Sequence, residues 1–308
     1  MTGLREALAG YLDLRRGLGF KLARDEKLLE QFIGWLEQRG TATVTVADAL
    51  AWATLPAGSS PGWLAFRMSV VRGFAGYLAT VDPAAEVPPA GLLPGGTHRA
   101  VPYLYSAADI LALMAQAQRL RTPLRTATIQ TLIGLLAVTG ARIGEVIALD
   151  DGDFDPGQGM LLVRQAKLGK HRLLPLHPTA VAAVQDYRQL RDQVFPLPAC
   201  PALLVSGAGT RLWYTDVSAT FVKLARRAGL DGRSGGSRPR PHDMRHSFAV
   251  ATLLDWCRDG GDVASRLPLL SAYLGHTEPA NTYWYLQASP ELLAEAARRL
   301  DDRPGGPR

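Results

Sequence analysis

The stretch Pro241-His242-Asp243-Met244-Arg245-His246-Ser247-Phe248-Ala249 contains two histidines and an arginine within little more than one helical turn. In a helix, His242, Arg245 and His246 would stand at i, i+3 and i+4 and share one face. The leading proline suits the first turn of such a helix, and the apolar residues that end the stretch would bury its back. We therefore expect a half-buried helix with a cationic cluster, which either holds a metal ion or contacts an anion.

The histidine spacing by itself permits a metal site. His242 and His246 have the i, i+4 spacing of a zinc-binding helix, but a metalloprotease motif requires Glu directly after the first histidine. Asp243 stands there instead, and Arg245 inside the motif would repel the ion. The sequence also lacks a nucleotide-binding glycine pattern, so we expect neither a metal nor another cofactor. The remaining alternative to an anion site is a basic surface helix with one structural histidine.

Composition and charge favour an anionic partner. The 308 residues are 47% hydrophobic, and Lys and Arg exceed Asp and Glu by 34 to 28, with a pI near 9.5. This excess is a mild indication of a polyanion such as nucleic acid, although many basic proteins bind none. Cys200 and Cys257 have no motif spacing, and there is neither a signal-peptide layout nor an apolar run of membrane-spanning length. We expect a two-domain protein of the reducing cytoplasm.

Apolar periodicity divides the chain into two parts. Residues 1–82 are expected to form a small all-helical domain, with helices at 4–18 and 25–40, from Thr45 and after Pro61. Residues 83–103 are rich in Pro and Gly and are expected to be an interdomain linker. A second domain, residues 104–308, would begin with a capping box formed by Ser106 and Asp109.

The second domain is expected to be mainly helical with a small antiparallel sheet. An apolar helix from about Pro123 should end at Gly140. Met160–Val163 and His171–Leu176 flank a turn at Gln165–Lys170, which is the pattern of a β-hairpin. Further helices are expected at about 178–194, at 214–228, from the opening stretch through Leu274, and at about 290–300.

An anion site can be assembled from residues of this domain. Arg142 follows a turn and precedes an apolar helix, whose backbone N–H groups also favour anions. Glu145, three residues on, is its candidate orienting partner. Arg142 and Arg245 together would clamp the non-bridging oxygens of a phosphodiester, with His276 as a further donor. Taken alone, an arginine such as Arg142 is more often solvated or salt-bridged.

The order of these motifs resembles the tyrosine recombinase family, also called the phage integrase family. Thr139–Val146 is similar to the family's first-arginine box, and His242–Ala249 to its His-x-x-Arg box. Leu274–Thr277, followed by Tyr285 nine positions after its histidine, is similar to the family's last histidine and its nucleophile. The resemblance covers about residues 104–300, and the N-terminal part matches by position and size only.

Two lysines compete for the hairpin position of the family. A lysine at a hairpin tip is ordinarily a solvated turn residue. Lys170–Pro175 resembles the strand start that follows the family's lysine, which favours Lys167 over Lys170. The turn departs from the usual pattern because Ala166 replaces a common glycine.

Two tyrosines likewise compete for the nucleophile. A tyrosine in this segment is ordinarily a core aromatic. The separation from His276 favours Tyr285 over Tyr283. Pro279 in the connecting stretch is less usual for the family and is expected to shift the local geometry.

The resemblance implies a C-shaped clamp around double-stranded DNA. In it, residues 1–82 form a helical core DNA-binding domain and residues 104–308 an α-rich catalytic domain. The family acts as a DNA-bound homotetramer, with helper recombination proteins in some systems, so the final helix at about 290–300 either docks on a neighbouring subunit or packs on its own domain. The alternatives are a type IB topoisomerase, which shares the catalytic plan, and a catalytically idle DNA-binding regulator.

The resemblance also implies the chemistry. The nucleophile attacks the scissile phosphate, a 3′-phosphotyrosyl link forms, and the 5′-hydroxyl leaves with a proton from the hairpin lysine. Two arginines and the last histidine stabilise the transition state. The first histidine assists them and is a candidate acceptor of the tyrosine proton. The implied catalytic residues are Arg142, Lys167, His242, Arg245, His276 and Tyr285.

Overall fold

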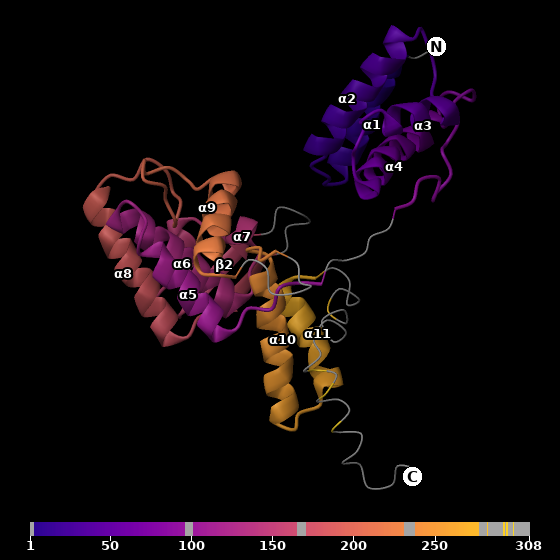
Figure 1. The fold of residues 1–308 in the computed structure, drawn as a ribbon. Helices are drawn as coiled ribbons and strands as arrows, with labels where there is room; N and C mark the ends of the chain where they lie inside the picture. The colour runs from indigo at the N-terminus through magenta and orange to yellow at the C-terminus, as the bar shows by residue number, and fades with distance from the viewer. Residues whose placement is uncertain are drawn as a thin grey trace, which may run out of the picture. The chain divides into compact units, whose positions relative to one another are not determined.

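The computed structural model describes residues 3–95, 101–164, 171–230 and 238–276, together with Thr282, Leu292, Ala294 and Arg298. Its contacts divide the chain into two compact units, Met1–Arg99 and Ala100–Arg308, and each unit has a core of its own (Figure 1). Within the described ranges, none of the helices combines the length and the apolarity that crossing a membrane requires.

The first unit is helical, as predicted. Thr45 caps α3 through its side chain, which accepts the backbone N–H of Asp48, and Ser60 caps α4 in the same way with Trp63 as donor. The apolar positions recur every three to four residues and meet in one core that includes the fully buried Phe32 and Phe74. The helices are α1 (Leu4–Gly17), α2 (Ala23–Gln38), α3 (Val46–Thr54) and α4 (Pro61–Leu78).

The first part of the predicted linker is attached to this unit. The backbone N–H of Glu86 donates to the carbonyl of Val44 over 2.8 Å, and the Glu86 carboxylate accepts the N–H of Val46 over 2.7 Å. Leu93 packs against the same core. The proline-rich segment is therefore held by hydrogen bonds and apolar contacts as far as its middle.

The second unit is built around a layer of helices, of which α5, α6 and α8 lie side by side (Figure 1). Ser106 and Asp109 form the predicted capping box at the start of α5. Helix α6 ends at Gly140, which has the left-handed conformation at φ 60°. The helices are α5 (Ala107–Ala117), α6 (Pro123–Thr139), α7 (Ile143–Ala148), α8 (Pro178–Val194), α9 (Tyr214–Arg227), α10 (Asp243–Arg258) and α11 (Val263–Leu274), with a 3₁₀ turn, η1, at Asp151–Asp153.

A three-stranded antiparallel sheet completes the mainly helical fold that the sequence predicted. Its strands, in order, are β1 (Phe154–Asp155), β2 (Met160–Arg164) and β3 (His171–Pro175). In β3, Leu174 is buried opposite Leu161, and Arg172 lies opposite Val163. Because side chains alternate along a strand, Arg172 and Leu174 lie on the same face.

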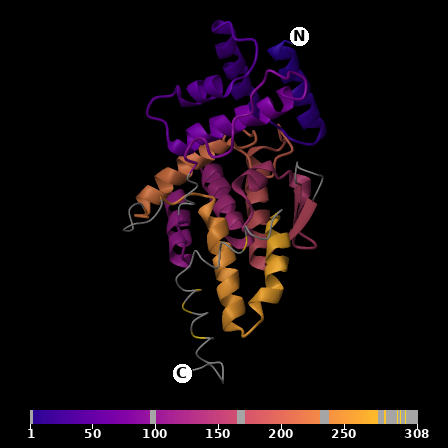
Figure 2. The same ribbon diagram turned by 90° about the vertical axis from the view of Figure 1, so that its right-hand side faces the viewer.

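Helices α10 and α11 form a hairpin of their own, joined at its far end by a short turn (Figures 1 and 2). Their facing sides share an apolar cluster that includes Leu253 and Leu274. Leu292, from the predicted final helix, is also buried in this cluster. At this position, the last helical segment packs against its own chain.

Candidate active site

Arg245 lies at the centre of the site, on the first turns of α10, and is only 1% exposed. Its guanidinium donates to the carbonyl of Gly140 over 2.9 Å and to that of Leu274 over 2.5 Å. Both carbonyls stand at the ends of helices, α6 and α11, where unpaired carbonyls carry partial negative charge. The C-terminal ends of two helices therefore hold a buried guanidinium group, which carries five N–H donors.

The two helix ends can approach Arg245 because each one turns at a glycine. Gly140 and Gly275 have φ values of 60° and 68°, a region that L-residues with a side chain rarely adopt. At Gly140 the ring of Phe248 also leaves no room, since an added Cβ would lie 2.5 Å from its Cδ1 atom. The first-arginine box and the His-x-x-Arg helix are thus in direct contact.

Arg142 directly follows this turn and caps the N-terminus of α7. Its guanidinium donates to the Glu145 carboxylate over 2.8 Å and to the carbonyl of Gly275 over 3.3 Å, and its backbone N–H donates to the same carboxylate. The prediction that Glu145 orients Arg142 is confirmed. The Arg142 side chain is 39% exposed, whereas Arg245 is 1% exposed.

A third arginine, which the sequence analysis did not single out, joins this pair. Arg172 of β3 donates to the Glu145 carboxylate over 2.7 and 3.2 Å. Burial disfavours ionisation of Glu145, but hydrogen bonds from Arg172 and Arg142 outweigh that effect and hold its pKa below the ordinary value. In the sequence, Arg172 stands two residues before an apolar leucine on the predicted strand. This spacing puts both side chains on the face that packs against the domain, which is the signal that could have identified Arg172.

The start of α10 differs from the prediction. The sequence placed the proline at position 241 in the first turn, but the helix begins at Asp243, and His242 is its N-cap. The backbone N–H groups of Asp243, Met244 and Arg245 bond carbonyls three residues back, so the chain enters the helix through tight turns. The rings of His242 and His246 still meet edge to face at 5.0 Å, as neighbours on one helical face do.

Both predicted histidines of the site are electrically neutral at physiological pH. Partial desolvation, together with the charges of Arg245 and Arg142, lowers the pKa of His242, although the residue as a whole is exposed. The same causes lower the pKa of His276 to about 4. A neutral imidazole carries one N–H donor and one acceptor nitrogen, so either ring can give or take a single proton.

Thr282 holds His276 in place. Its hydroxyl and the imidazole Nδ1 share a hydrogen bond of 2.8 Å, and Thr282 is only 1% exposed. The sequence analysis did not foresee this contact. Thr282 precedes the predicted nucleophile, Tyr285, by three residues in the sequence.

The structure therefore brings together four of the six predicted site residues, namely Arg142, His242, Arg245 and His276. The other two, Lys167 and Tyr285, lie outside the described residues, as do their competitors Lys170 and Tyr283.

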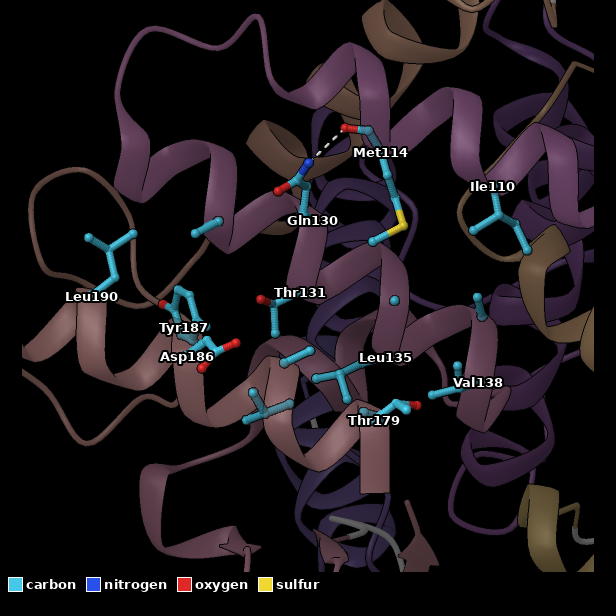
Figure 3. Close-up of a pocket in the computed structure, with 16 residues that line it drawn as sticks. Ile110, Met114, Gln130, Thr131, Leu135, Val138, Thr179, Asp186, Tyr187 and Leu190 are labelled. Carbon is cyan, nitrogen blue, oxygen red and sulfur yellow. Dashed lines mark hydrogen bonds between the residues drawn. The ribbon is translucent and has the colours of Figure 1, made fainter. Parts of the chain in front are cut away.

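An apolar cavity of about 520 Å³ lies elsewhere in this unit, against α5, α6 and α8 (Figure 3). Gln130 reaches across its edge and donates to the carbonyl of Met114 over 2.9 Å. Asp186 is the one charged residue among the described residues that line it. Arg142, Arg172 and Arg245 are not among these lining residues. The cavity does not suit a phosphate.

Comparisons with known proteins point to one family. The sequence pattern of the phage integrase family matches residues 105–291. The chain is 43% identical to the putative integrase/recombinase y4rB of Sinorhizobium fredii, over 98% of both proteins. It is 27% identical to the tyrosine recombinase XerC of Herpetosiphon aurantiacus, over 96% of this chain and 94% of that protein.

A solved structure shows the same fold. The Tn1549 transposon integrase in complex with a circular intermediate DNA aligns with a TM-score of 0.65 at 18% identity. The alignment covers 97% of this chain and all of that one. Both units of the present chain thus have counterparts in one known architecture.

Proposed function

This chain belongs to the phage integrase family of tyrosine recombinases, enzymes that break and rejoin DNA at specific sites, and from that membership we propose that Tyr285 attacks a scissile phosphodiester of duplex DNA. The observation that carries the proposal is the pair of guanidiniums of Arg142 and Arg245, both bonded to the turn at Leu274 and Gly275. An arginine pair matches the two non-bridging oxygens of one phosphate.

This pair of arginines and His276 would stabilise the negative charge of the transition state. As the tyrosine oxygen adds to phosphorus, negative charge accumulates on the non-bridging oxygens. Preorganised donors at such positions contribute roughly 10²–10³ each to the rate. Arg245 is fixed by two carbonyls, Arg142 by Glu145, and His276 by Thr282, so these donors need little reorganisation when the charge develops. With its pKa of about 4, His276 acts as a neutral N–H donor.

Proton transfer falls to His242 and Lys167. The lowered pKa of His242 leaves it neutral, which lets it accept the proton of the Tyr285 hydroxyl. The Tyr285 oxygen–phosphorus bond forms, the bond from phosphorus to the 5′-oxygen breaks, and Lys167 protonates that oxygen. The phosphodiester energy is kept in the 3′-phosphotyrosyl link, so rejoining is the reverse reaction and needs no nucleotide.

The DNA is held by more than the catalytic site. We assign residues 1–82 to a second DNA-binding domain that works with the catalytic domain, residues 104–308, across the linker 83–103. The near-complete coverage of y4rB and of the DNA-bound Tn1549 integrase supports this assignment. Both strands of each of the two duplexes must be cut and rejoined, one strand by each subunit, which calls for a tetramer on the DNA.

A covalent-adduct assay tests the nucleophile. A pool of nicked duplexes with a randomised core is incubated with the protein, denatured, and selected for DNA that stays attached to it. The selected duplex then serves as the suicide substrate. Tyr285→Phe should bind this duplex like the parent and form no adduct, whereas Tyr283→Phe should still form it. The assignment is wrong if Tyr285→Phe forms the adduct and Tyr283→Phe does not.

Plasmids that carry the selected site separate the proposed function from the alternatives. A topoisomerase of type IB would relax supercoiled plasmids without pairing two sites, and a DNA-binding regulator would bind without an adduct. Recombination between two copies of the selected site on one plasmid is the outcome that the proposed function requires.

A further inference from the structure

One carboxylate, that of Glu145, serves two arginines at once. Its Oε1 atom accepts the Arg142 guanidinium over 2.8 Å and that of Arg172 over 3.2 Å. Its Oε2 atom accepts the Arg142 backbone N–H and the Arg172 guanidinium, both over 2.7 Å. Each oxygen is therefore shared between α7 and β3.

The two arginines differ in how far they reach into solvent. The side chains of Arg172 and Glu145 are 11% and 13% exposed, whereas that of Arg142 is 39% exposed. Arg172 is thus the inner partner and Arg142 the outer one. A carboxylate paired with Arg142 alone would cancel the charge that a phosphate needs, while a second guanidinium leaves the trio with a net positive charge.

We propose that Arg172 is a positioning residue for DNA cleavage, which acts through Glu145 to orient Arg142 and to keep its charge available to the scissile phosphate. The inference rests on the proposed function. It also gives β3 a role in the site, because Arg172 ties the base of the hairpin that carries Lys167 to the helix that Arg142 caps.

A purely structural role explains these contacts less well. A buried ion pair is weak evidence of stabilisation, because desolvation of the two charges offsets their attraction. The Nε atom of Arg172 is buried and finds no hydrogen-bond partner among the described residues, a further unfavourable feature. The charge of Arg172 also contributes to the lowered pKa of His276, so Arg172 acts electrostatically on a second residue of the candidate site.

The same hairpin offers a matched control. Arg164 of β2 donates to the buried carboxylate of Asp153 over 2.7 Å and pairs with Asp150. Like Arg172, it is an arginine on the hairpin bound to a carboxylate of the preceding segment. Its carboxylates belong to η1 and the residue before it, and their partners among the described contacts are Arg164 and Arg211, not Arg142.

The experiment measures single-turnover cleavage of the selected suicide duplex by four variants: Arg172→Gln, Arg142→Gln, the double variant and Arg164→Gln. Arg172→Gln should cleave about 10–100-fold more slowly, the usual effect of losing a residue that orients a functional group. The double variant should be no slower than Arg142→Gln alone, since both changes remove one interaction. Arg164→Gln should cleave at the parental rate, even if its melting temperature falls.

A second substrate separates positioning from structure. A methylphosphonate at the scissile position removes the negative charge that Arg142 stabilises, so the defects of Arg142→Gln and Arg172→Gln should both shrink on it. Arg172→Lys, which keeps the charge but not the two parallel bonds, should fold and show a smaller defect on normal DNA. Arg172→Lys therefore still tests the proposal if Arg172→Gln does not fold.

The inference is overturned if Arg172→Gln and Arg172→Lys cleave like the parent, if the defect multiplies with that of Arg142→Gln, or if it persists on the methylphosphonate. In each case the parent still forms the adduct and Arg142→Gln is still slow, so the proposed function stands. A parent that forms no adduct would overturn both.

Discussion

Replacing Gly140 by alanine should lower the free energy of unfolding, because Gly140 lies in a left-handed turn packed against Phe248. A residue with a side chain at φ 60° loses about 1–2 kcal/mol, and overpacking a closed core adds about 1–3 kcal/mol. Here the new Cβ would lie 2.5 Å and 2.9 Å from two ring atoms of Phe248 and 3.2 Å from Leu274. The ring belongs to α10 and stacks on the ring of Tyr273, so both effects apply, and the sum is about 2–5 kcal/mol.

This loss should be visible in thermal unfolding followed by circular dichroism. For a unit of this size, one kcal/mol corresponds to about 2–4 °C, so the midpoint of Gly140→Ala should fall by roughly 4–20 °C. Gly144→Ala is the control, because an added Cβ there meets nothing within 4 Å and alanine favours the helix by about 0.5–1 kcal/mol. If Gly140→Ala melts with the parent, or Gly144→Ala loses as much, the reasoning about the turn is refuted.

Four further predictions follow from the site. Lys167→Ala should be about 10²–10⁴-fold slow on normal DNA and recover on a substrate with sulfur at the 5′-bridging position, because a thiolate leaves without a proton. Lys170→Ala should resemble the parent on both substrates, and the opposite pattern would exchange the two assignments. Thr282→Val should slow cleavage while Thr282→Ser retains it, since only the hydroxyl holds His276; equal rates in a single-turnover assay would contradict this. Since the pKa of His276 is about 4 in the folded chain against 6.5 ordinarily, the unfolded chain takes up the proton first as the pH falls. Stability should therefore decline between about pH 6.5 and 4, and His276→Gln should reduce that decline in melts recorded across this range. DNA affinity should fall by about 10³–10⁵ between 50 and 200 mM salt for six to ten phosphate contacts, and residues 104–308 alone should bind more weakly; a flat salt response, or full affinity from that fragment, would count against binding by both domains.

The sequence by itself determined the local elements and the residue types of the site. Caps such as that at Ser106 and the glycine that ends α6 depend on neighbours within about four residues, and the strands of the hairpin are short runs rich in apolar residues on either side of one turn, so these patterns are legible along the chain. The link between Arg142 and Glu145 belongs to the same class, because it spans a single turn. The order of the motifs then indicated the family.

Only the tertiary structure decided what holds Arg245 and Arg172. The carbonyls that bind Arg245 come from positions 105 and 29 residues away in the chain, and no local pattern records that two helix ends converge there. Arg172 reaches Glu145 across 27 residues because the hairpin folds back on α7. These contacts depend on packing between elements, which periodicity within one element does not encode.

The protonation states of the site were likewise decided by the fold. A histidine has the same intrinsic pKa wherever it stands in a sequence, and His276 differs only because burial and the charges of Arg245, Arg142 and Arg172 surround it. The sequence supplied a histidine at a suitable position. The folded chain turned it into a neutral donor by bringing three cations from separate segments around it, since desolvation and Coulomb repulsion act through space and not along the chain.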